Sequence, residues 1–123
     1  MKWILVFMGS GMGGCLRLFT AEIARKYYNT SSFPVGTLVA NIIACILLGL
    51  FIGLADNRIV DDKTKLFLTI GLCGGFSTFS TFSYETVSLF SDQKILEGSL
   101  YIAASVITCL LAIILGNLLA RQL

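Results

Sequence analysis

The sequence predicts an all-α membrane protein with four transmembrane helices. Three observations support this fold class: 56% of the 123 residues are hydrophobic, 13% are charged, and the mean hydropathy is +0.87. A soluble domain has about twice that charged fraction, roughly 25%. The charged residues also occur in short clusters. The apolar segments between them are each about 20 residues long, the length that crosses a bilayer as a helix.

The four predicted spans form one domain, residues 1–123, and cover about residues 3–22, 35–54, 65–90 and 95–119. On the first span, Gly9 and Gly13 form a G-x-x-x-G pair, which lets another helix approach closely in a membrane. On the second span, Asn41 starts a series of small residues at every fourth position. This spacing places one amide on a face suited to close packing.

The third predicted span contains adjacent glycines followed by the repeat FSTFSTFS. Gly74 and Gly75 weaken a helix. The Ser and Thr hydroxyls that follow them can bond to nearby backbone groups and so replace helical hydrogen bonds. We therefore expect the third helix to be broken near its middle, between Gly74 and Thr78.

The repeat places Phe76, Phe79 and Phe82 three residues apart. On a continuous helix their rings would form a slowly turning ladder with hydroxyls beside it. A phenyl ring has no net charge, but its edge is partly positive and can contact an anion. Hydroxyls and the Asn41 amide donate ordinary hydrogen bonds to an anion. Such groups replace part of an anion's hydration shell and still release it. The residues by themselves predict transport of a small ion or solute.

Other polar side chains lie on the spans. Tyr101, Ser105 and Cys109 recur every fourth residue and share one face of the fourth span. Arg17 and Glu85 are the deepest ionisable groups, each near the end of a span, and intramembrane charges are often functional. For Arg17 the sequence favours a side chain that reaches the membrane–water interface, or a structural ion pair with a carboxylate, over contact with a ligand. A pair with Glu85 is left open.

Several function classes are excluded by what the sequence lacks. There is no histidine, no H-E-x-x-H motif, no phosphate-binding loop and no pair of carboxylates within one span, so we expect no enzyme. The net charge of +2 does not support nucleic-acid binding. The four cysteines lie in four different apolar segments without a C-x-x-C pair, and we interpret them as buried apolar residues rather than disulfides.

The charges give only a weak preference for one orientation in the membrane. Five basic residues lie on the side of the two termini and of the 55–65 connection, against three on the other side. A weak preference permits insertion in both orientations and pairing as an antiparallel dimer. A single orientation is the alternative, and the charges do not decide between them.

Two other functions fit a chain of four short spans. A small proton-coupled exporter requires an acid near the membrane centre, usually in the first span, where this chain has only Glu22 at the end. A non-transporting assembly subunit, held together by its small-residue faces, would leave the FSTFSTFS repeat unexplained.

Over nearly its whole length, the chain resembles the Fluc-type small bacterial fluoride channels, which export fluoride. The resemblance is carried by the glycine-rich first span ending in Arg17, by PVGTLVAN at 34–41 and by GLCGGFSTFSTFSYE at 71–85. It implies a fluoride-selective channel in the inner (plasma) membrane that passively lowers cytoplasmic fluoride. It also implies an antiparallel dual-topology homodimer, with two pores, in the lipid bilayer.

The same resemblance implies roles for individual residues. Phe79 and Phe82 would contact fluoride through their ring edges, and Asn41 would donate its amide. The other implied pathway residues are Ser80, Thr81, Ser83, Tyr101, Ser105 and Cys109. At the last of these the family often has serine, a stronger donor than a thiol. A structural Na⁺ on the dimer axis would be held by backbone carbonyls of Gly74 and Ser77, with Arg17 and Glu85 as structural or vestibule residues.

Overall fold

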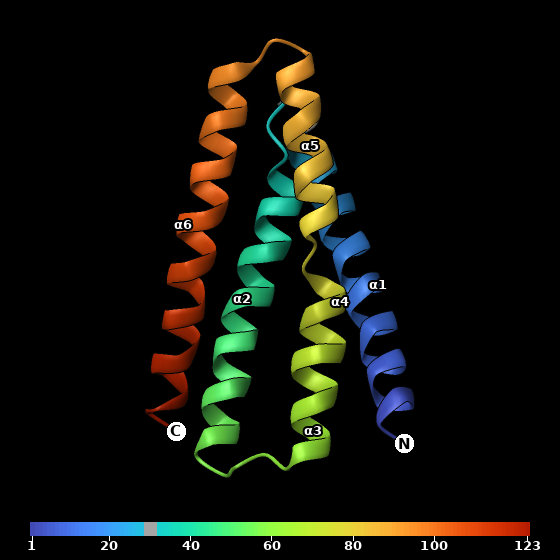
Figure 1. The fold of residues 1–123 in the computed structure, drawn as a ribbon, viewed down its shortest axis with the longest axis vertical. Coiled ribbons are helices and arrows are strands. Elements are labelled where there is room, and N and C mark those ends of the chain that lie inside the picture. Colours follow the sequence, from blue (N-terminus) through green and yellow to red (C-terminus); the bar gives the residue numbers. More distant parts are fainter. Residues whose placement is uncertain (29–31) are drawn as a thin grey trace.

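The computed structural model describes residues 1–28 and 32–123 as a bundle of helices (Figure 1). In chain order the elements are α1 (Lys2–Tyr28), α2 (Val35–Asp56), α3 (Asp62–Leu66), η1 (Phe67–Cys73), α4 (Gly74–Phe76), α5 (Phe79–Ser91) and α6 (Ile95–Ala120). The elements α3 to α5 follow one another along a single column (Figure 1). Within the described residues, four helical segments are long and apolar enough to cross a membrane. The predicted number of spans is therefore confirmed.

The first and third spans extend beyond their predicted ends. The last turn of α1 carries Arg25 and Lys26, and cations are favourable at the C-terminus of a helix, so α1 continues past the apolar segment. The third span starts early because Asp61 caps α3: its side chain accepts a hydrogen bond from the backbone N–H of Lys63 at 3.3 Å. The hydroxyl of Thr64 also donates to Asp61, and this bond is the main reason that the pKa of Asp61 is lowered.

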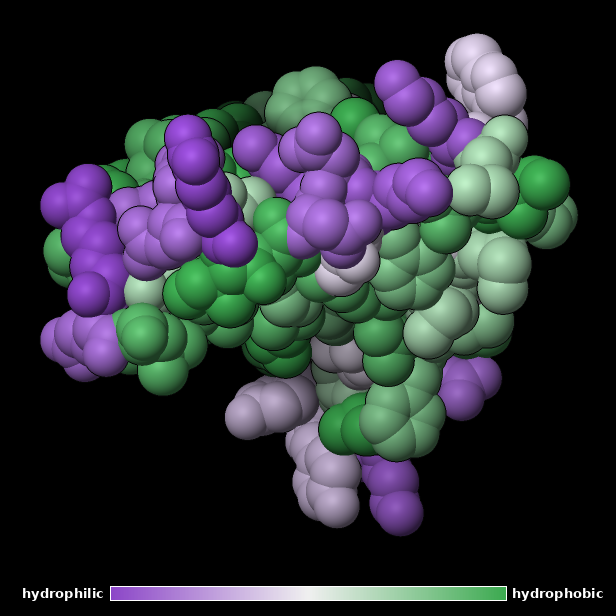
Figure 2. All heavy atoms as spheres, turned by 90° about the horizontal axis from the view of Figure 1, so that it is seen from below, coloured by the Kyte–Doolittle hydropathy of each residue, from purple (hydrophilic) through white to green (hydrophobic). Residues whose placement is uncertain are grey.

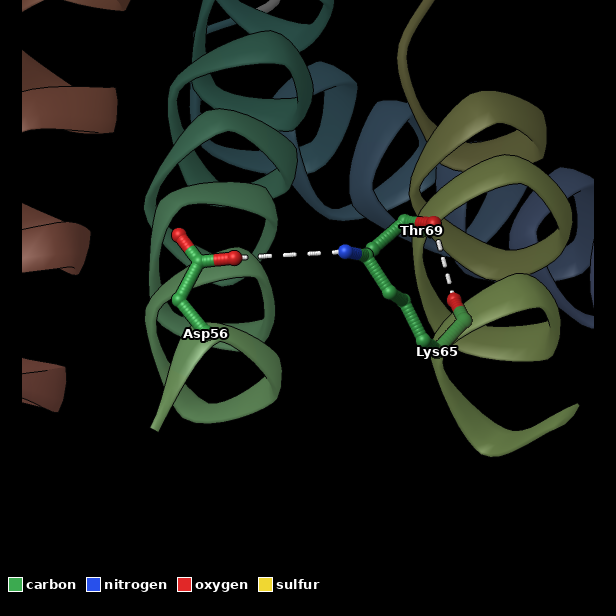
Figure 3. Close-up of polar contacts among 3 residues, drawn as sticks. All are labelled: Asp56, Lys65 and Thr69. Carbon is green, nitrogen blue, oxygen red and sulfur yellow. Dashed lines mark hydrogen bonds and ion pairs between the residues drawn. The ribbon is translucent and has the colours of Figure 1, made fainter. Parts of the chain in front are cut away.

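Both termini and the connection between α2 and α3 lie at one end of the bundle (Figure 1). Hydrophilic side chains gather on this end, with hydrophobic side chains around them (Figure 2). Here Lys65 Nζ lies 4.0 Å from Asp56 Oδ1, and the hydroxyl of Thr69 donates to the carbonyl of Lys65 at 2.8 Å (Figure 3). Because both charged side chains are largely exposed, this ion pair contributes little to stability.

Glycines let α1 pack directly against the backbone of the third span. A Cβ added to Gly13 would lie 2.2 Å from the carbonyl oxygen of Leu72, and one added to Gly9 would lie 2.8 Å from the Cα of Gly71. On the other side of the contact, a Cβ on Gly75 would lie 2.4 Å from the carbonyl oxygen of Ser10. The close approach predicted from the G-x-x-x-G pair is confirmed.

A second glycine contact joins α2 to α6. A Cβ on Gly49 would lie 2.2 Å from the carbonyl oxygen of Ile113, and one on Gly116 would lie 2.0 Å from that of Ile46. The predicted small-residue face of the second span therefore packs against the fourth span, and the two helices are held at backbone distance.

The third span departs from a regular α-helix in two places. The first is η1, which is a π-helix with wider turns than an α-helix. Here the N–H of Gly74 donates to the carbonyl of Thr69, five residues back. Gly74 and Gly75 are helical, and the extended residues are Ser77 (φ −74°, ψ 156°) and Thr78 (φ −151°, ψ 121°). Close packing on α1 explains the glycine at 75.

The extended residues separate the three phenylalanines of the repeat. Phe76 precedes them and is buried against Ala40 and Ala44 in the core. Phe79 follows them and is 79% exposed. The predicted ladder of three rings is therefore wrong, because the backbone does not continue as one helix from Phe76 to Phe79. Only the second and third rings belong together.

Replacing Gly13 with alanine should destabilise the protein, because its methyl group would overlap the backbone of Leu72. We expect the free energy of unfolding to fall by about 1–3 kcal/mol, the usual effect of overpacking. Thermal unfolding of the purified protein in detergent measures this change. Gly11→Ala is the matched control, since a Cβ there meets nothing within 4 Å. Equal melting temperatures for the two variants would contradict the packing described here.

Candidate functional site

The site is organised around a pair of hydrogen bonds between Asn41 and the backbone of Thr78. The Thr78 N–H donates to Asn41 Oδ1 at 2.8 Å, and Asn41 Nδ2 donates to the Thr78 carbonyl at 3.2 Å. The side-chain amide thus pairs with an extended residue as a neighbouring strand would. Backbone groups at membrane depth require such partners because no water is present to satisfy them. An amide nitrogen carries two hydrogens, so the contact leaves one for a ligand.

The hydroxyl of Thr78 starts the next helix. It accepts a hydrogen bond from the N–H of Thr81 at 3.2 Å, which is the usual N-cap geometry for α5. It also donates to the Thr81 hydroxyl at 3.1 Å and lies 3.2 Å from that of Ser80. Further along, the Ser83 hydroxyl donates to the carbonyl of Phe79 at 2.9 Å. These hydroxyls are engaged in local bonds at the start of the helix.

A pocket of about 250 Å³ lies beside this break, between α2, α5 and α6. Its lining residues are uncharged: Asn41, Cys45, Ser77, Thr78, Phe79, Phe82, Ser105, Val106 and Cys109. Ser105 is 6% exposed, and its hydroxyl has no hydrogen-bond partner among the described residues. A buried hydroxyl without a partner carries an energetic penalty of about 1–3 kcal/mol, so this group is available to a ligand in the pocket.

Aromatic rings form one wall of the pocket and continue behind it. The Phe82 ring lies 5.5 Å from that of Phe79 and 5.2 Å from that of Tyr101, both in tilted contacts. Tyr101 is fully buried, and its ring meets that of Phe33 edge-on at 5.3 Å. The fourth span therefore fixes the position of Phe82, while Phe79 keeps one face open.

Glu85 is held by two hydroxyl groups. Tyr101 Oη donates to Glu85 Oε2 at 2.7 Å, and Thr37 Oγ1 donates to Glu85 Oε1 at 2.8 Å. In the part of the chain that the structure describes, no ion pair joins Glu85 to Arg17. The carboxylate instead links α2, α5 and α6 behind the pocket.

The structure brings six of the predicted site residues together at the pocket: Asn41, Ser77, Phe79, Phe82, Ser105 and Cys109. The other predicted residues lie outside its lining: Ser80, Thr81, Ser83, Tyr101, Gly74, Arg17 and Glu85. Sequence reasoning missed Thr37 and Cys45 as site residues and assigned Thr78 only to the break. Thr37 lies one turn before Asn41 and Cys45 one turn after it. Both therefore share a helix face with the amide, and this shared face was the signal that could have marked them as candidates.

The break also exposes the poles of two helices near the pocket. The first turn of α5 begins at Phe79, and a helix N-terminus carries partial positive charge. The N–H of Thr78, which would bond to the Gly74 carbonyl in a continuous helix, donates to Asn41 instead. Among the described residues no group of three or more His, Cys, Asp or Glu side chains is arranged to hold a metal ion.

Comparison with known proteins assigns the chain to a family. The family model described as "CrcB-like protein, Camphor Resistance (CrcB)" matches residues 4–117, nearly the whole chain. The chain belongs to the CrcB-like family. This membership confirms the relationship predicted from the sequence motifs.

Relatives within the CrcB-like family carry a functional name. A protein of Flavobacterium psychrophilum named "Fluoride-specific ion channel FluC" is 42% identical over 119 residues, which cover 96% of this chain and 95% of the relative. Proteins with the same name from Phocaeicola vulgatus and Pyrococcus furiosus are each 43% identical, over 92% and 96% of this chain and over 93% and 94% of the relatives. These CrcB-like relatives are named ion channels rather than enzymes, in agreement with the absence of a catalytic motif.

Replacing Asn41 with alanine should destabilise the protein, because both backbone groups of Thr78 lose their partner. We expect the free energy of unfolding to fall by about 1–3 kcal/mol for each group left unsatisfied. Thermal unfolding in detergent measures the change. Asn57→Ala is the control, since that exposed amide donates a single bond, 3.3 Å long, to Ala120. A smaller effect at Asn41 than at Asn57 would show that the break does not depend on this pairing.

Proposed function

We propose that the chain is a fluoride-selective channel through which fluoride leaves the cell passively. The observation that carries this proposal is the buried Ser105 hydroxyl without a partner, which lines an uncharged pocket beside Asn41 and two phenylalanine rings. The pocket offers a hydroxyl, an amide N–H and ring edges, all of which are attracted to an anion. The name shared by the CrcB-like relatives supports fluoride as that anion.

The mechanism follows from the kind of groups in the pocket. A small anion entering it would exchange water for the Ser105 hydroxyl, the second N–H of Asn41 and the edges of Phe79 and Phe82. The N-terminal pole of α5 adds partial positive charge without a lysine or arginine. Because none of the described residues that line the pocket is cationic, binding stays weak enough for the anion to leave. Fluoride, the smallest halide and the strongest hydrogen-bond acceptor among them, gains most from such donors.

The proposed pathway includes polar groups beyond the pocket. The hydroxyls of Ser80, Thr81 and Ser83 lie on the first turns of α5, and Tyr101 extends the polar face of the fourth span behind Phe82. Each of these hydroxyls could exchange its present partner for the anion as the anion passes. Arg17 and Glu85 serve the structure or the entrance in this proposal.

The functional unit in this proposal is an antiparallel homodimer with two such pathways. Phe79 supports it, because a ring that is 79% exposed on one chain has an open face that a second chain could cover. A Na⁺ ion at the dimer axis would stabilise the assembly through the carbonyls of Gly74 and Ser77. The break leaves the Gly74 carbonyl without its usual helical donor, and oxygen ligands suit a hard cation.

Purified protein in liposomes should release fluoride rapidly and chloride negligibly when the ions are followed in parallel with selective electrodes. Phe82→Ile should slow fluoride release, because it replaces a ring edge by an aliphatic group. Ser105→Ala should also slow it, although removal of an unpaired buried hydroxyl leaves stability unchanged or raised. Phe7→Ile is the control, since that ring is 80% exposed on α1 and outside the pocket. No fluoride release from folded protein would reject the channel and favour an exporter or an assembly subunit.

Replacing Na⁺ by a large organic cation should weaken the dimer, if carbonyls of the break hold the ion. Light scattering coupled to size-exclusion chromatography in detergent measures the mass of the particle in both buffers. A monomer in Na⁺ buffer would overturn the dimer. Thermal unfolding in the two buffers compares the stability of the dimer with and without Na⁺. Equal stability in both buffers would overturn the role of Na⁺ but leave the dimer itself in place.

A further inference from the structure

The pocket contains a pair of thiols that the proposed conduction mechanism does not require. Cys45 of α2 and Cys109 of α6 both line it. They lie on two helices whose separation is fixed by the contact between Gly49 and the carbonyl of Ile113, and these two residues follow Cys45 and Cys109 by one turn each. Helix packing therefore holds the two thiols at the same level of the bundle.

The other two cysteines have different surroundings. Cys73 is 1% exposed in η1, and Cys15 is exposed on α1; neither lines the pocket. In the described part of the chain, no third His, Cys, Asp or Glu side chain completes a metal site with the pair. Two sulfur atoms without a third ligand suit an ion that accepts two ligands in a linear arrangement.

We propose that Cys45 and Cys109 form a binding site for a soft, two-coordinate metal ion, with Hg²⁺ as its simplest representative, and that the bound ion obstructs the pocket. Thiolate sulfur is a soft ligand that selects soft metal ions. Hard ions such as Na⁺ and Mg²⁺, which prefer oxygen, have no ligand set here. The site thus discriminates between metal ions by their chemical softness.

The binding step balances without a change of oxidation state. Two S–H bonds break, two Hg–S bonds form, and two protons leave through the pocket to water. The product carries no net charge, because two thiolates neutralise one divalent ion. A neutral product is favoured at membrane depth, where an unpaired charge is strongly penalised. Two thiolates around a monovalent soft ion would instead leave one negative charge.

The effect on transport rests on the proposed function, whereas binding of the ion does not. Cys45 and Cys109 line the same pocket as Asn41 and Ser105. An ion held between the two sulfur atoms would displace whatever occupies that part of the pocket. Fluoride would then lose its access to the Ser105 hydroxyl and the Asn41 amide.

Native mass spectrometry and fluoride efflux test the proposal together. Cys15→Ser serves as the reference protein, because it removes the exposed thiol on α1 and leaves the pocket intact. The reference is treated with Hg²⁺ and then washed with a monothiol, which strips singly bonded mercury more readily than a chelated ion. We expect one retained Hg²⁺ per chain and loss of most of the fluoride efflux. A dithiol chelator should restore the efflux.

Two further variants, Cys15→Ser with Cys109→Ser and Cys15→Ser with Cys45→Ser, each keep one thiol in the pocket. We expect neither to retain the ion after the wash, and each to keep the efflux rate that it shows before treatment. Equal retention by the reference protein and both variants would overturn the site. Retention confined to the reference without loss of efflux would overturn the obstruction. Retention by a reference protein that never conducts fluoride would leave the metal site standing and reject the proposed function.

Discussion

Two hydrogen bonds between the Asn41 side chain and the backbone of Thr78 hold together the irregular part of this molecule. Extended residues inside a membrane span are unfavourable unless their N–H and C=O groups are paired. One amide at 2.8 and 3.2 Å satisfies both groups of Thr78. The start of α5, the position of Phe79 and Phe82 and the shape of the pocket all depend on that pairing, because they follow directly from where the helix resumes.

The rest of the bundle supports this pairing by keeping the helices close. Asn41 reaches Thr78 only if α2 and the third span are correctly placed. The glycines of α1 place the third span, and the contact of Gly49 with α6 places α2 against the fourth span. Dispersion forces act at short range, and small residues let backbones approach within that range in lipid. The polar site is thus built on apolar contacts that carry no chemistry of their own.

The spans and the glycine contacts could be predicted from the sequence because they depend on composition and on spacing along a helix. Helix propensity predicted a break within residues 74–78 but could not locate it at Ser77 and Thr78. Gly74 and Gly75 are weak helix formers, yet both are helical, since packing against Ser10 outweighs propensity. The predicted ring ladder was wrong for a different reason: the helix is interrupted at Ser77 and Thr78, and three-residue spacing aligns side chains only within one continuous helix.

Among the site residues, those on regular helices were the easier ones to predict. Four-residue spacing placed Asn41, Ser105 and Cys109 on defined helix faces, and the resemblance to the fluoride channels implied their roles in the site. The structure places all three at one pocket. The partners of Glu85 were not predicted, because Thr37 and Tyr101 belong to separate helices. Contacts between distant segments depend on how each helix is rotated about its axis relative to its neighbours, and this rotation cannot be read from a single sequence.

The widened turns of η1 have a consequence for how such a chain can change over time. A wide turn holds an additional residue within nearly the same height, so it rotates everything that follows about the helix axis. The orientation of α4, with Gly75 against α1 and Phe76 in the core, is therefore set by residues 67–73, none of which lines the pocket. An insertion or deletion of a single residue there would turn Gly75 away from α1 and Phe76 out of the core, although the sequence of the repeat would be unchanged.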